Sequence, residues 1–326
     1  MECCDAPCND DENNDDDNDN NEEQFDGYEL VWNDEFNGNS IDNSKWNFEI
    51  GTGNWGWGNG EHQYYTSRSE NAFIQDGKLI IRALLESYSS SNYTSARMTT
   101  KNKGDWTYGK IVARIKVPSA GGTWPAFWLM PTNSVYGGWP NSGEIDIMEH
   151  YGCDNNHIHS TVHNNMYNWN GGIPPTSYSA YTSATSDFHI YETEWNEDEL
   201  NFYVDGQYLG TYFRTNGGWQ QWPYNQDFYI ILNLAIGSHF MQCSTEDELF
   251  PQQLEIDYVR VYQEVQCNLN GDTNSDNDVN VIDIVVLVDQ ILNSSNFDPC
   301  LDLNQDGLIN VVDVVSLINL IISTNR

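Results

Sequence analysis

The sequence predicts an all-β protein, built as a two-sheet sandwich or jelly roll, with a small helical module at its C-terminal end. Short runs of alternating apolar and polar residues recur from Tyr28 to residue 263, separated by Gly, Asn and Asp turns. The 12 Trp, 19 Tyr and 12 Phe residues are typical of sheets with aromatic-lined surfaces. Beyond residue 263, two Asp- and Asn-rich loops repeat, and each runs into an apolar segment.

The 326-residue chain is longer than a single hydrophobic core usually supports, so we expect three segments. Residues 1–26 are almost wholly Asp, Asn and Glu and are predicted to form a disordered acidic tether. Residues 27–263 form a large β domain, and residues 264–326 form the small module. The expected strands of the β domain are 28–32, 78–83, 109–117, 188–195, 200–204 with the turn Asp205-Gly206, 228–234 and 254–262.

The formal net charge of −36 restricts the class of ligand. Nucleic acid is excluded, because its phosphates would be repelled, and sulfated polymers are disfavoured for the same reason. A neutral substrate is the simplest inference. No stretch approaches the roughly 18 consecutive apolar residues of a membrane-spanning helix.

Residues 143–150, Gly-Glu-Ile-Asp-Ile-Met-Glu-His, are the centre of the functional prediction. Side chains alternate along a strand, so Glu144 and Asp146 share one face. Glu149 lies five positions after Glu144, and a regular strand would turn it to the opposite, apolar face. A β-bulge at Ile147-Met148 would return Glu149 to the face of the other two carboxylates. An acidic edge strand that resists aggregation is the alternative, but it does not explain the slip in register.

Two carboxyl groups placed around one bond are what glycoside hydrolysis requires. In a retaining enzyme one is the nucleophile and the other the general acid/base, roughly 5–5.5 Å apart. Glu144 and Glu149 would form such a pair on a concave sheet. Asp146 lies between them, and its charge would help to separate their pKa values so that one carboxyl stays protonated.

Five tryptophans near this strand or in a Gly-rich loop are candidates for binding sugar rings, whose apolar faces stack on aromatic rings. Trp124, Trp128 and Trp139 precede the strand, and Trp55 and Trp57 lie in the loop 53–59. We expect Trp55 and Trp57 to be exposed for binding. For Trp128, burial in the core is a competing interpretation.

The seven cysteines fall into three groups, and none has zinc-binding spacing. The groups are Cys3, Cys4 and Cys8, then Cys153 and Cys243, then Cys267 and Cys300. The last two flank one segment and are predicted to form a disulfide, which would imply an oxidising compartment. Reduced, buried cysteines are the alternative.

The first residues of the sequence indicate where the protein is located. A Cys followed by a short acidic run resembles the start of a mature bacterial lipoprotein, with Cys3 or Cys4 as the residue that would carry lipid. A plain solvated linker is the alternative. We therefore expect a secreted or cell-surface-anchored protein.

The two repeated loops place oxygen-bearing side chains at loop positions 1, 3, 5, 9 and 12, with a backbone carbonyl at position 7, a set typical of Ca²⁺ sites. Position 12 is Asp rather than the Glu of a full EF-hand, so each EF-hand-like loop should feed one helix. Solvated turns are the alternative. The predicted ligands are Asp272, Asn274, Asp276, Asp278, Asn280 and Asp283 in the first loop, and Asp302, Asn304, Asp306, Leu308, Asn310 and Asp313 in the second.

Five motifs are spread in order over residues 28–263. They are WNDEF at 32–36, GTWPAFW at 122–128, GEIDIMEH at 143–150, ILNLA at 231–235 and DYVRVY at 257–262. With these motifs, the segment is similar to catalytic domains of glycoside hydrolase family 16, in its laminarinase (endo-β-1,3-glucanase) branch. The resemblance implies a concanavalin-like β-jelly-roll with a long cleft that cleaves β-1,3-glucan with retention, with mixed-linkage β-1,3-1,4-glucan as a further substrate. Within the family, the inserted residue Met148 separates this branch, and agarases, from strict lichenases.

The resemblance also implies roles for individual residues. Glu144 is the nucleophile, Asp146 its partner and Glu149 the acid/base. His163 matches a cleft histidine that hydrogen-bonds the sugar beyond the scissile bond, although a surface role fits this strand position equally. Further candidates for contacts with sugar hydroxyls are Asn59, Arg68 and Asn233.

Family members also hold a structural Ca²⁺ on the convex side. Glu35, Gly77 and Asp257 occupy the matching positions, with Gly77 and Glu35 contributing backbone oxygens. We therefore expect three calcium ions, two in the C-terminal module and one in the catalytic domain, and no cofactor for catalysis.

Residues 267–322 resemble a dockerin module. Asn277 stands where the first loop usually has Gly, and Asn tolerates the left-handed conformation that this position needs. The recognition positions are Val281-Ile282 and Val311-Val312, apolar in both repeats. If exposed, they would suit a hydrophobic partner such as a cohesin; if buried, they would pack against the enzyme's own domain. The chain itself is expected to be a monomer.

Two alternative functions remain open. The first is a galactan hydrolase of the same family, an agarase or porphyranase, although 13 Lys and Arg residues leave little to pair with sulfate. The second is a non-catalytic, polysaccharide-binding jelly roll. The presence of both glutamates argues against this second reading.

Overall fold

The computed structural model describes residues 25, 27–154, 156–168, 175–265, 267, 269–274, 276–293 and 298–324. Apart from Phe25, the predicted acidic tether 1–26 lies outside the described residues. Contacts divide the chain into two compact units, one of which is Glu29–Val265 and the other of which contains Gln266–Arg326. The division falls close to the boundary between residues 263 and 264 that the sequence predicts.

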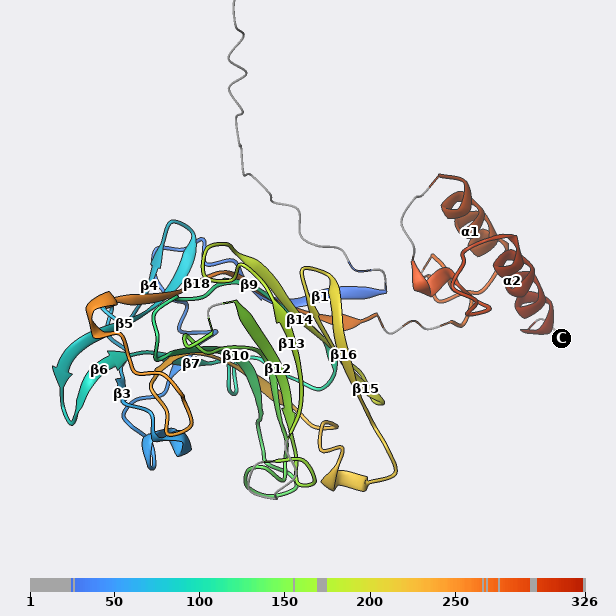
Figure 1. Ribbon diagram of the computed structural model, residues 1–326. Helices are drawn as coiled ribbons and strands as arrows, with labels where there is room; N and C mark the ends of the chain where they lie inside the picture. Colours follow the sequence, from blue (N-terminus) through green and yellow to red (C-terminus); the bar gives the residue numbers. More distant parts are fainter. Residues whose placement is uncertain are drawn as a thin grey trace, which may run out of the picture. The chain divides into compact units, whose positions relative to one another are not determined.

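The unit Glu29–Val265 is a jelly roll of two β-sheets (Figure 1). The ten-stranded sheet has the order β16 (Gln207–Phe213), β15 (Glu199–Val204), β14 (His189–Trp195), β9 (Gly109–Lys116), β18 (Gln252–Glu264), β5 (Lys78–Tyr88), β6 (Ser91–Ser95) and β3 (Gln63–Tyr65), with β1 (Tyr28–Asp34) on β18 and β4 (Ala72–Gln75) on β5.

The second sheet carries the cleft. Its eight strands have the order β13 (Thr176–Tyr181), β12 (His157–His163), β11 (Glu144–His150), β10 (Thr123–Pro131), β17 (Phe228–Ile236), β7 (Arg97–Thr99) and β2 (Asn47–Phe48), with β8 (Asp105–Trp106) on β17. Short helical turns lie at Gly56–Gly60, Gly218–Gln220 and Asp247–Leu249. We call the face of this sheet that points away from the core the cleft face.

Alternation along the strands builds the core between the sheets. On β10, Phe127 and Leu129 are fully buried while Trp128 between them is half-buried, because neighbouring side chains point to opposite faces. The competing interpretation of Trp128 as a core residue is therefore wrong. The turn Asp205-Gly206 joins β15 to β16 with φ values of 50° and 69°, the backbone that a two-residue hairpin favours.

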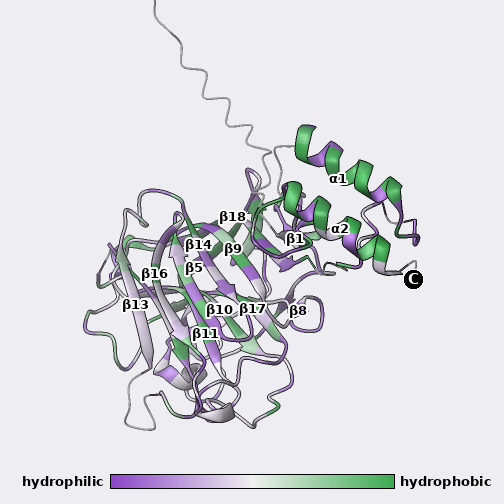
Figure 2. Ribbon diagram, turned by 90° about the vertical axis from the view of Figure 1, so that its right-hand side faces the viewer, coloured by the Kyte–Doolittle hydropathy of each residue, from purple (hydrophilic) through white to green (hydrophobic). Residues whose placement is uncertain are grey.

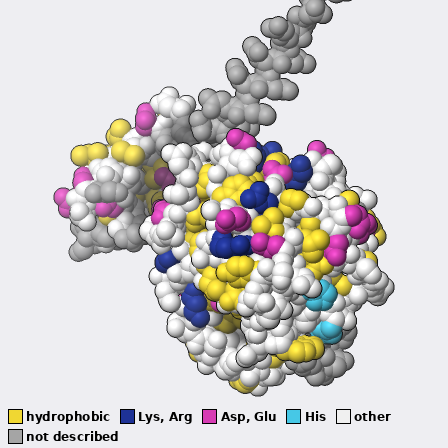
Figure 3. Space-filling model, turned by 90° about the vertical axis from the view of Figure 1, so that its left-hand side faces the viewer, with side chains coloured by type: hydrophobic (Ala, Val, Ile, Leu, Met, Phe, Trp, Pro, Cys, Tyr) yellow, Lys and Arg dark blue, Asp and Glu magenta, His cyan; other side chains and the backbone are white. Residues whose placement is uncertain are grey.

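The surface of the jelly roll mixes residue types. Figure 3 shows one of its faces, on which hydrophobic side chains gather beside Lys, Arg, Asp and Glu. Among the described residues, no helix is long and apolar enough to cross a membrane.

The C-terminal unit contains two helices, α1 (Val281–Asn293) and α2 (Val311–Thr324), and the short turn Pro299–Leu301. Leu287, Leu301 and Leu317 form its small buried core. The predicted disulfide between Cys267 and Cys300 is present and ties the start of this unit to that turn. Each Asp/Asn-rich loop precedes one helix, as expected.

The two loops repeat the same backbone pattern. Asp272 accepts hydrogen bonds from the backbone N–H groups of Asp276 and Asn277, at 3.0 and 2.8 Å. Asp302 does the same for Asp306 and Gly307, at 3.1 and 2.8 Å. Asn277 and Gly307 both have positive φ, 69° and 82°, so Asn277 adopts the left-handed conformation expected of it.

Candidate active site

The predicted bulge is present in β11. On the β12 side, Asp146 pairs with Thr161 and Glu149 pairs with His159, so three steps along β11 match two along β12. The register with β10 shifts at the same place. Ser160 donates a hydrogen bond to the carbonyl of Ile147 at 2.8 Å, which satisfies an acceptor inside the bulge.

The bulge brings the three carboxylates to one cavity. Glu144, Asp146 and Glu149 all line a cavity of about 600 Å³ on the cleft face, while Ile147 and Met148 are both buried in the core. The interpretation of residues 143–150 as an acidic edge strand is wrong, because β11 lies between β10 and β12.

Indole N–H groups hold the two glutamates. Trp139 donates to Glu144 Oε2, and Trp124 donates to Glu149 Oε1 at 3.0 Å. The hydroxyl of Tyr151 also donates to Glu149 Oε1, at 3.4 Å. Trp124 and Trp139 therefore orient the carboxylates, and both also line the cavity.

Burial sets the protonation of the acidic residues. It raises the pKa of Glu149 to about 7, the negative charge of Glu144 acts in the same direction, and His163 and the hydrogen bonds from Trp124 and Tyr151 oppose the rise. Burial, followed by the charges of Glu144 and Glu149, raises the pKa of Asp146 well above its usual range. At neutral pH, Glu149 therefore holds a proton in much of the population, as a general acid requires.

His163 lies against the carboxylates of Asp146 and Glu144. It pairs across the strands with Glu144, and its Nε2 lies 3.2 Å from Asp146 Oδ2 and 4.0 Å from Glu144 Oε1. Burial lowers the pKa of His163, but the charges of Glu144 and the neighbouring carboxyls outweigh this and raise it to about 9. Its Nδ1 is buried and has no hydrogen-bond partner in the described part of the chain.

Most of the predicted sugar-binding residues line the cavity. Trp57 and Asn59 reach it from the Gly-rich loop, and Asn233 reaches it from β17, where it accepts a hydrogen bond from Trp128 Nε1 at 2.7 Å. The predicted residues on the cavity wall are Trp57, Asn59, Trp124, Trp128, Trp139, Glu144, Asp146, Glu149, His163 and Asn233.

Two predicted sugar contacts lie elsewhere. Trp55 is 68% exposed but does not line the cavity; its ring packs 5.0 Å from that of His239. Arg68 is also outside the cavity, because its guanidinium pairs with Glu86 and stacks over the ring of Tyr88. The prediction that Arg68 contacts substrate is therefore wrong, because these partners hold its guanidinium outside the cavity.

Several wall residues were not predicted. Tyr151 and His159 could have been found by alternation, because Tyr151 follows Glu149 by two positions and His159 precedes His163 by four. Arg97 offers no such signal. Its guanidinium lies 4.7 Å from the ring of Trp57 and 4.8 Å from that of Trp128, between segments distant in the sequence.

The loop after β17 covers the Glu149 end of the cavity. The ring of Phe240 lies 5.0 Å from that of Trp124 and 6.0 Å from that of Tyr151. A disulfide between Cys153 and Cys243, whose pairing the sequence left open, links this loop to the segment that follows β11.

The residues predicted to bind calcium in this unit have other side-chain partners. Arg260 binds the Glu35 carboxylate through two hydrogen bonds of 2.9 Å, which leaves Glu35 only its backbone oxygen. Arg114 donates to Asp257 Oδ2 at 2.6 Å, so an ion at Asp257 would have to displace this pair. Gly77 lies in a turn with φ 70°.

This fold and site define a class of protein: a jelly-roll polysaccharide hydrolase that works with two facing carboxylates. Comparison with known families agrees, since the model of glycosyl hydrolases family 16 matches residues 59–260. The chain belongs to this family.

Three relatives of the chain are a laminarinase, a glucan endo-1,3-β-glucosidase and a keratan-sulfate endo-1,4-β-galactosidase. The structure of the laminarinase from Rhodothermus marinus is 42% identical and superposes with a TM-score of 0.71, covering 73% of this chain and 98% of that one. A glucan endo-1,3-β-glucosidase of Cryptopygus antarcticus is 38% identical over 71% of this chain and 90% of its own length. A keratan-sulfate endo-1,4-β-galactosidase of Sphingobacterium multivorum is 36% identical over 76% of this chain and 58% of its own length.

Proposed function

We propose that this chain is an endo-acting β-1,3-glucanase that cleaves its substrate with retention of anomeric configuration. The observation that carries the proposal is the bulged strand β11, which places Glu144 and Glu149 on one wall of the cavity. The similarity to a laminarinase and to a glucan endo-1,3-β-glucosidase supports the choice of linkage.

The geometry supports a double displacement. In the first step, Glu144 attacks the anomeric carbon while the protonated Glu149 gives its proton to the glycosidic oxygen, so the leaving chain departs as an alcohol. In the second step, Glu149 takes a proton from water, and the resulting nucleophile breaks the bond to Glu144. His163, whose pKa is raised to about 9, lies 4.0 Å from Glu144 Oε1, so its positive charge stabilises the Glu144 carboxylate. Asp146 lies beside His163 at 3.2 Å, and burial raises the pKa of Asp146 well above its usual range.

The cavity favours a neutral glucan over a sulfated galactan. Among its wall residues, the cationic groups are Arg97 and the two histidines His159 and His163. Arg97 already pairs with Glu49, and burial lowers the pKa of His159, which disfavours its charged form. The charge of His163 is already met by Asp146 and Glu144, so little positive charge is left to meet a sulfate group.

A substrate panel tests the proposal. We expect laminarin to be cleaved to oligosaccharides of several lengths, mixed-linkage glucan to be cleaved more slowly, and agarose and porphyran to be left intact. Product lengths measured by chromatography, and product anomers measured by NMR at early times, provide the readout. Cleavage of agarose or porphyran without cleavage of laminarin would establish the galactanase alternative, and binding without cleavage the non-catalytic one.

Removing the cover over Glu149 should shift the pH dependence of activity. In Phe240→Ala, water reaches Trp124 and Tyr151, so the pKa of Glu149 should fall from about 7 toward its usual value, by about one unit. Glu149 must be protonated to act as an acid, so activity is lost as pH rises through this pKa. The alkaline limb of the kcat/KM profile should therefore move to lower pH.

The matched control is Leu249→Ala. Leu249 is 48% exposed in the same connection between β17 and β18 but does not line the cavity, so its profile should match that of the parent chain. An unchanged alkaline limb in Phe240→Ala would show that Phe240 does not set the pKa.

For the C-terminal unit, we propose two calcium ions held by the repeated loops, and a third ion at Asp257, Gly77 and Glu35 in the catalytic unit. The repeated oxygen-bearing positions of the loops and their matching hydrogen bonds support the first two. Chelation by EGTA should lower the melting temperature of the C-terminal unit, and Ca²⁺ should restore it.

Two variants sharpen this prediction. Asp272→Ala removes a proposed ligand and should reduce the response to Ca²⁺, whereas Asp289→Ala alters a carboxylate on α1 outside the loops and should not. A calorimetric trace that is the same with Ca²⁺ and with EGTA would argue against calcium in the loops.

We also propose a dockerin-type role for this unit, with a hydrophobic, cohesin-type protein as its partner. Val281, Ile282, Val311 and Val312 are between 47% and 68% exposed, so both predicted recognition pairs are accessible. Figure 2 shows that α1 and α2 are coloured mostly hydrophobic. Titration calorimetry with cohesin domains, against a Val281→Asp/Val311→Asp double variant, would test the interaction.

The proposed location is outside the cytoplasm, secreted or held at the cell surface. Two disulfides, Cys153–Cys243 and Cys267–Cys300, support an oxidising compartment. Cell fractionation of the producing organism, with mass spectrometry of the N-terminal peptide for lipid on Cys3 or Cys4, would decide between secretion and anchoring.

A further inference from the structure

A series of aromatic rings leads out of the cavity toward the edge of the cleft sheet. It starts at Tyr151, which contacts the acid/base Glu149, and passes to His159 at 5.4 Å between ring centres. The next steps are from His159 to His157 and from His157 to Tyr181, each 4.4 Å. Tyr151 and His159 line the cavity, whereas His157 and Tyr181 lie beyond it.

These rings share the cleft face because of strand alternation. His157, His159 and His163 are odd-numbered residues on β12, so they point to the same face, and two of them line the cavity. On β13, Tyr181 pairs directly with His157 and shares its face with Ser177, which also lines the cavity. The ring series therefore follows the cleft face from β11 to the edge strand β13.

Tyr181 is unusual in being both exposed and held in place. Tyr181 is 77% exposed, yet its ring stacks on that of His157 with an angle of only 4° between the ring planes. His157 is fixed in turn, since its Nδ1 lies 3.3 Å from Asp154 Oδ2. One face of the Tyr181 ring packs on His157, which leaves the opposite face open to solvent. A flat, oriented and solvent-facing ring is what a sugar stacks on.

We propose that Tyr181, supported by His157, forms a distal binding site for the leaving-group portion of the glucan chain. The inference rests on the proposed β-glucanase activity and adds a chain-length preference to it. The series begins at the residue bonded to the acid/base, the group that protonates the leaving oxygen, so its rings extend on the leaving-group side. Each ring-to-ring step is comparable with the length of one hexose unit, so short leaving groups would end before Tyr181.

The test compares kcat/KM for laminari-oligosaccharides of increasing length in the full chain and in Tyr181→Ala. We expect kcat/KM to fall about 3- to 10-fold for long oligosaccharides, as is usual for loss of an aromatic stack, and to be unchanged for the shortest cleavable ones. Tyr181→Phe keeps the ring and should restore the value for long substrates. With substrates labelled at the reducing end, Tyr181→Ala should shift cleavage toward that end, which gives shorter labelled products.

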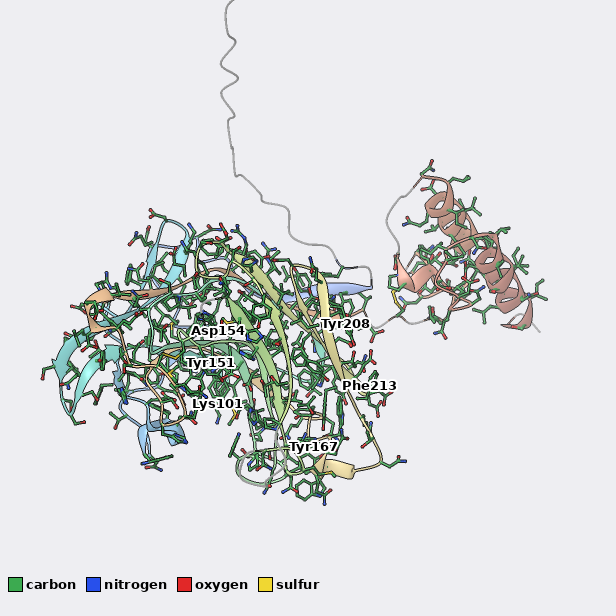
Figure 4. The ribbon with its side chains drawn as sticks, viewed as in Figure 1. Lys101, Tyr151, Asp154, Tyr167, Tyr208 and Phe213 are labelled. Atoms are coloured by element: carbon green, nitrogen blue, oxygen red, sulfur yellow. A yellow bond between two sulfur atoms is a disulfide. The ribbon has the colours of Figure 1, made fainter. Side chains whose placement is uncertain are left out.

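The matched control is Tyr208→Ala. Tyr208 is another exposed tyrosine, 59% exposed, whose ring lies beside that of Tyr203 on the other sheet, and Figure 4 shows it well apart from Tyr151. Its replacement should leave all lengths unaffected.

The outcomes are distinguishable. Suppose that the parent chain cleaves the laminari-oligosaccharides, and that Tyr181→Ala lowers kcat/KM by the same factor at every length or leaves it unchanged at every length. The distal site is then refuted, while the glucanase activity stands. If the parent chain cleaves no laminari-oligosaccharide, the proposed activity is refuted and the distal site with it. A shift of the labelled products in the opposite direction would assign the rings to the other side of the scissile bond and overturn the inference.

Discussion

Glu144→Ala should lower kcat on laminarin by more than about 10⁴-fold, because the variant lacks the carboxylate that forms the covalent bond to the anomeric carbon. Glu144 is the carboxylate that Trp139 holds and His163 approaches at 4.0 Å. Burial, followed by the charge of Glu144, raises the pKa of the neighbouring Asp146 well above its usual range, which makes Asp146 the weaker nucleophile. The measurement is the initial rate of release of reducing ends, with thermal melting to show that the variant folds.

Azide, a small external nucleophile, can show whether Glu144 acts as the nucleophile or has another role. Alanine at position 144 leaves room for azide, which attacks the anomeric carbon of an activated glycoside once and gives a glycosyl azide of inverted configuration. We expect this product by NMR from Glu144→Ala. An azide product of retained configuration, or undiminished activity, would show that Glu144 is not the nucleophile.

Glu149→Ala should lower kcat on laminarin by about 10²–10⁴-fold, the usual contribution of general acid–base catalysis. The loss should depend on the leaving group. An aryl glycoside whose phenol leaves without protonation needs no acid in the first step, so its bond cleavage should be almost unaffected while the covalent intermediate accumulates. A burst of phenol followed by slow turnover is the expected result.

The configuration of the azide product distinguishes Glu149→Ala from Glu144→Ala. In Glu149→Ala the nucleophile is intact, so azide should attack the covalent intermediate and give a product of retained configuration, opposite to that from Glu144→Ala. Glu70→Ala, at an exposed carboxylate outside the cavity, is the neutral control. Equal losses on laminarin and on the activated glycoside would argue against Glu149 as the acid.

The catalytic strand could be predicted from local spacing. A strand has a period of two, so the odd separation of Glu144 and Glu149 on an otherwise alternating stretch demands one extra residue, and β11 contains it. Trp124, Trp128 and Trp139 could be placed at the site because they belong to strands and connections adjacent to that strand in the sequence.

Other features had no local signal. The pairing of Arg68 with Glu86, which keeps Arg68 out of the cavity, joins the connection between β3 and β4 to β5, and the sequence gives no sign of this contact. The position of Phe240 over the Glu149 end joins segments distant in the sequence, and so does the disulfide that ties its loop, Cys153–Cys243, whose cysteines are 90 positions apart. Arg97 between Trp57 and Trp128 is a third case.

The sequence by itself therefore determined the fold class, the bulge and the placement of Glu144 and Glu149 on one face, because each follows from the fixed alternation of side chains along a strand. Only the tertiary structure decided which of the polar and aromatic residues reach the cavity and how far their pKa values move. Burial and charge proximity depend on contacts between segments distant in the chain, and Glu149 acquires a pKa of about 7 only where the walls close around it.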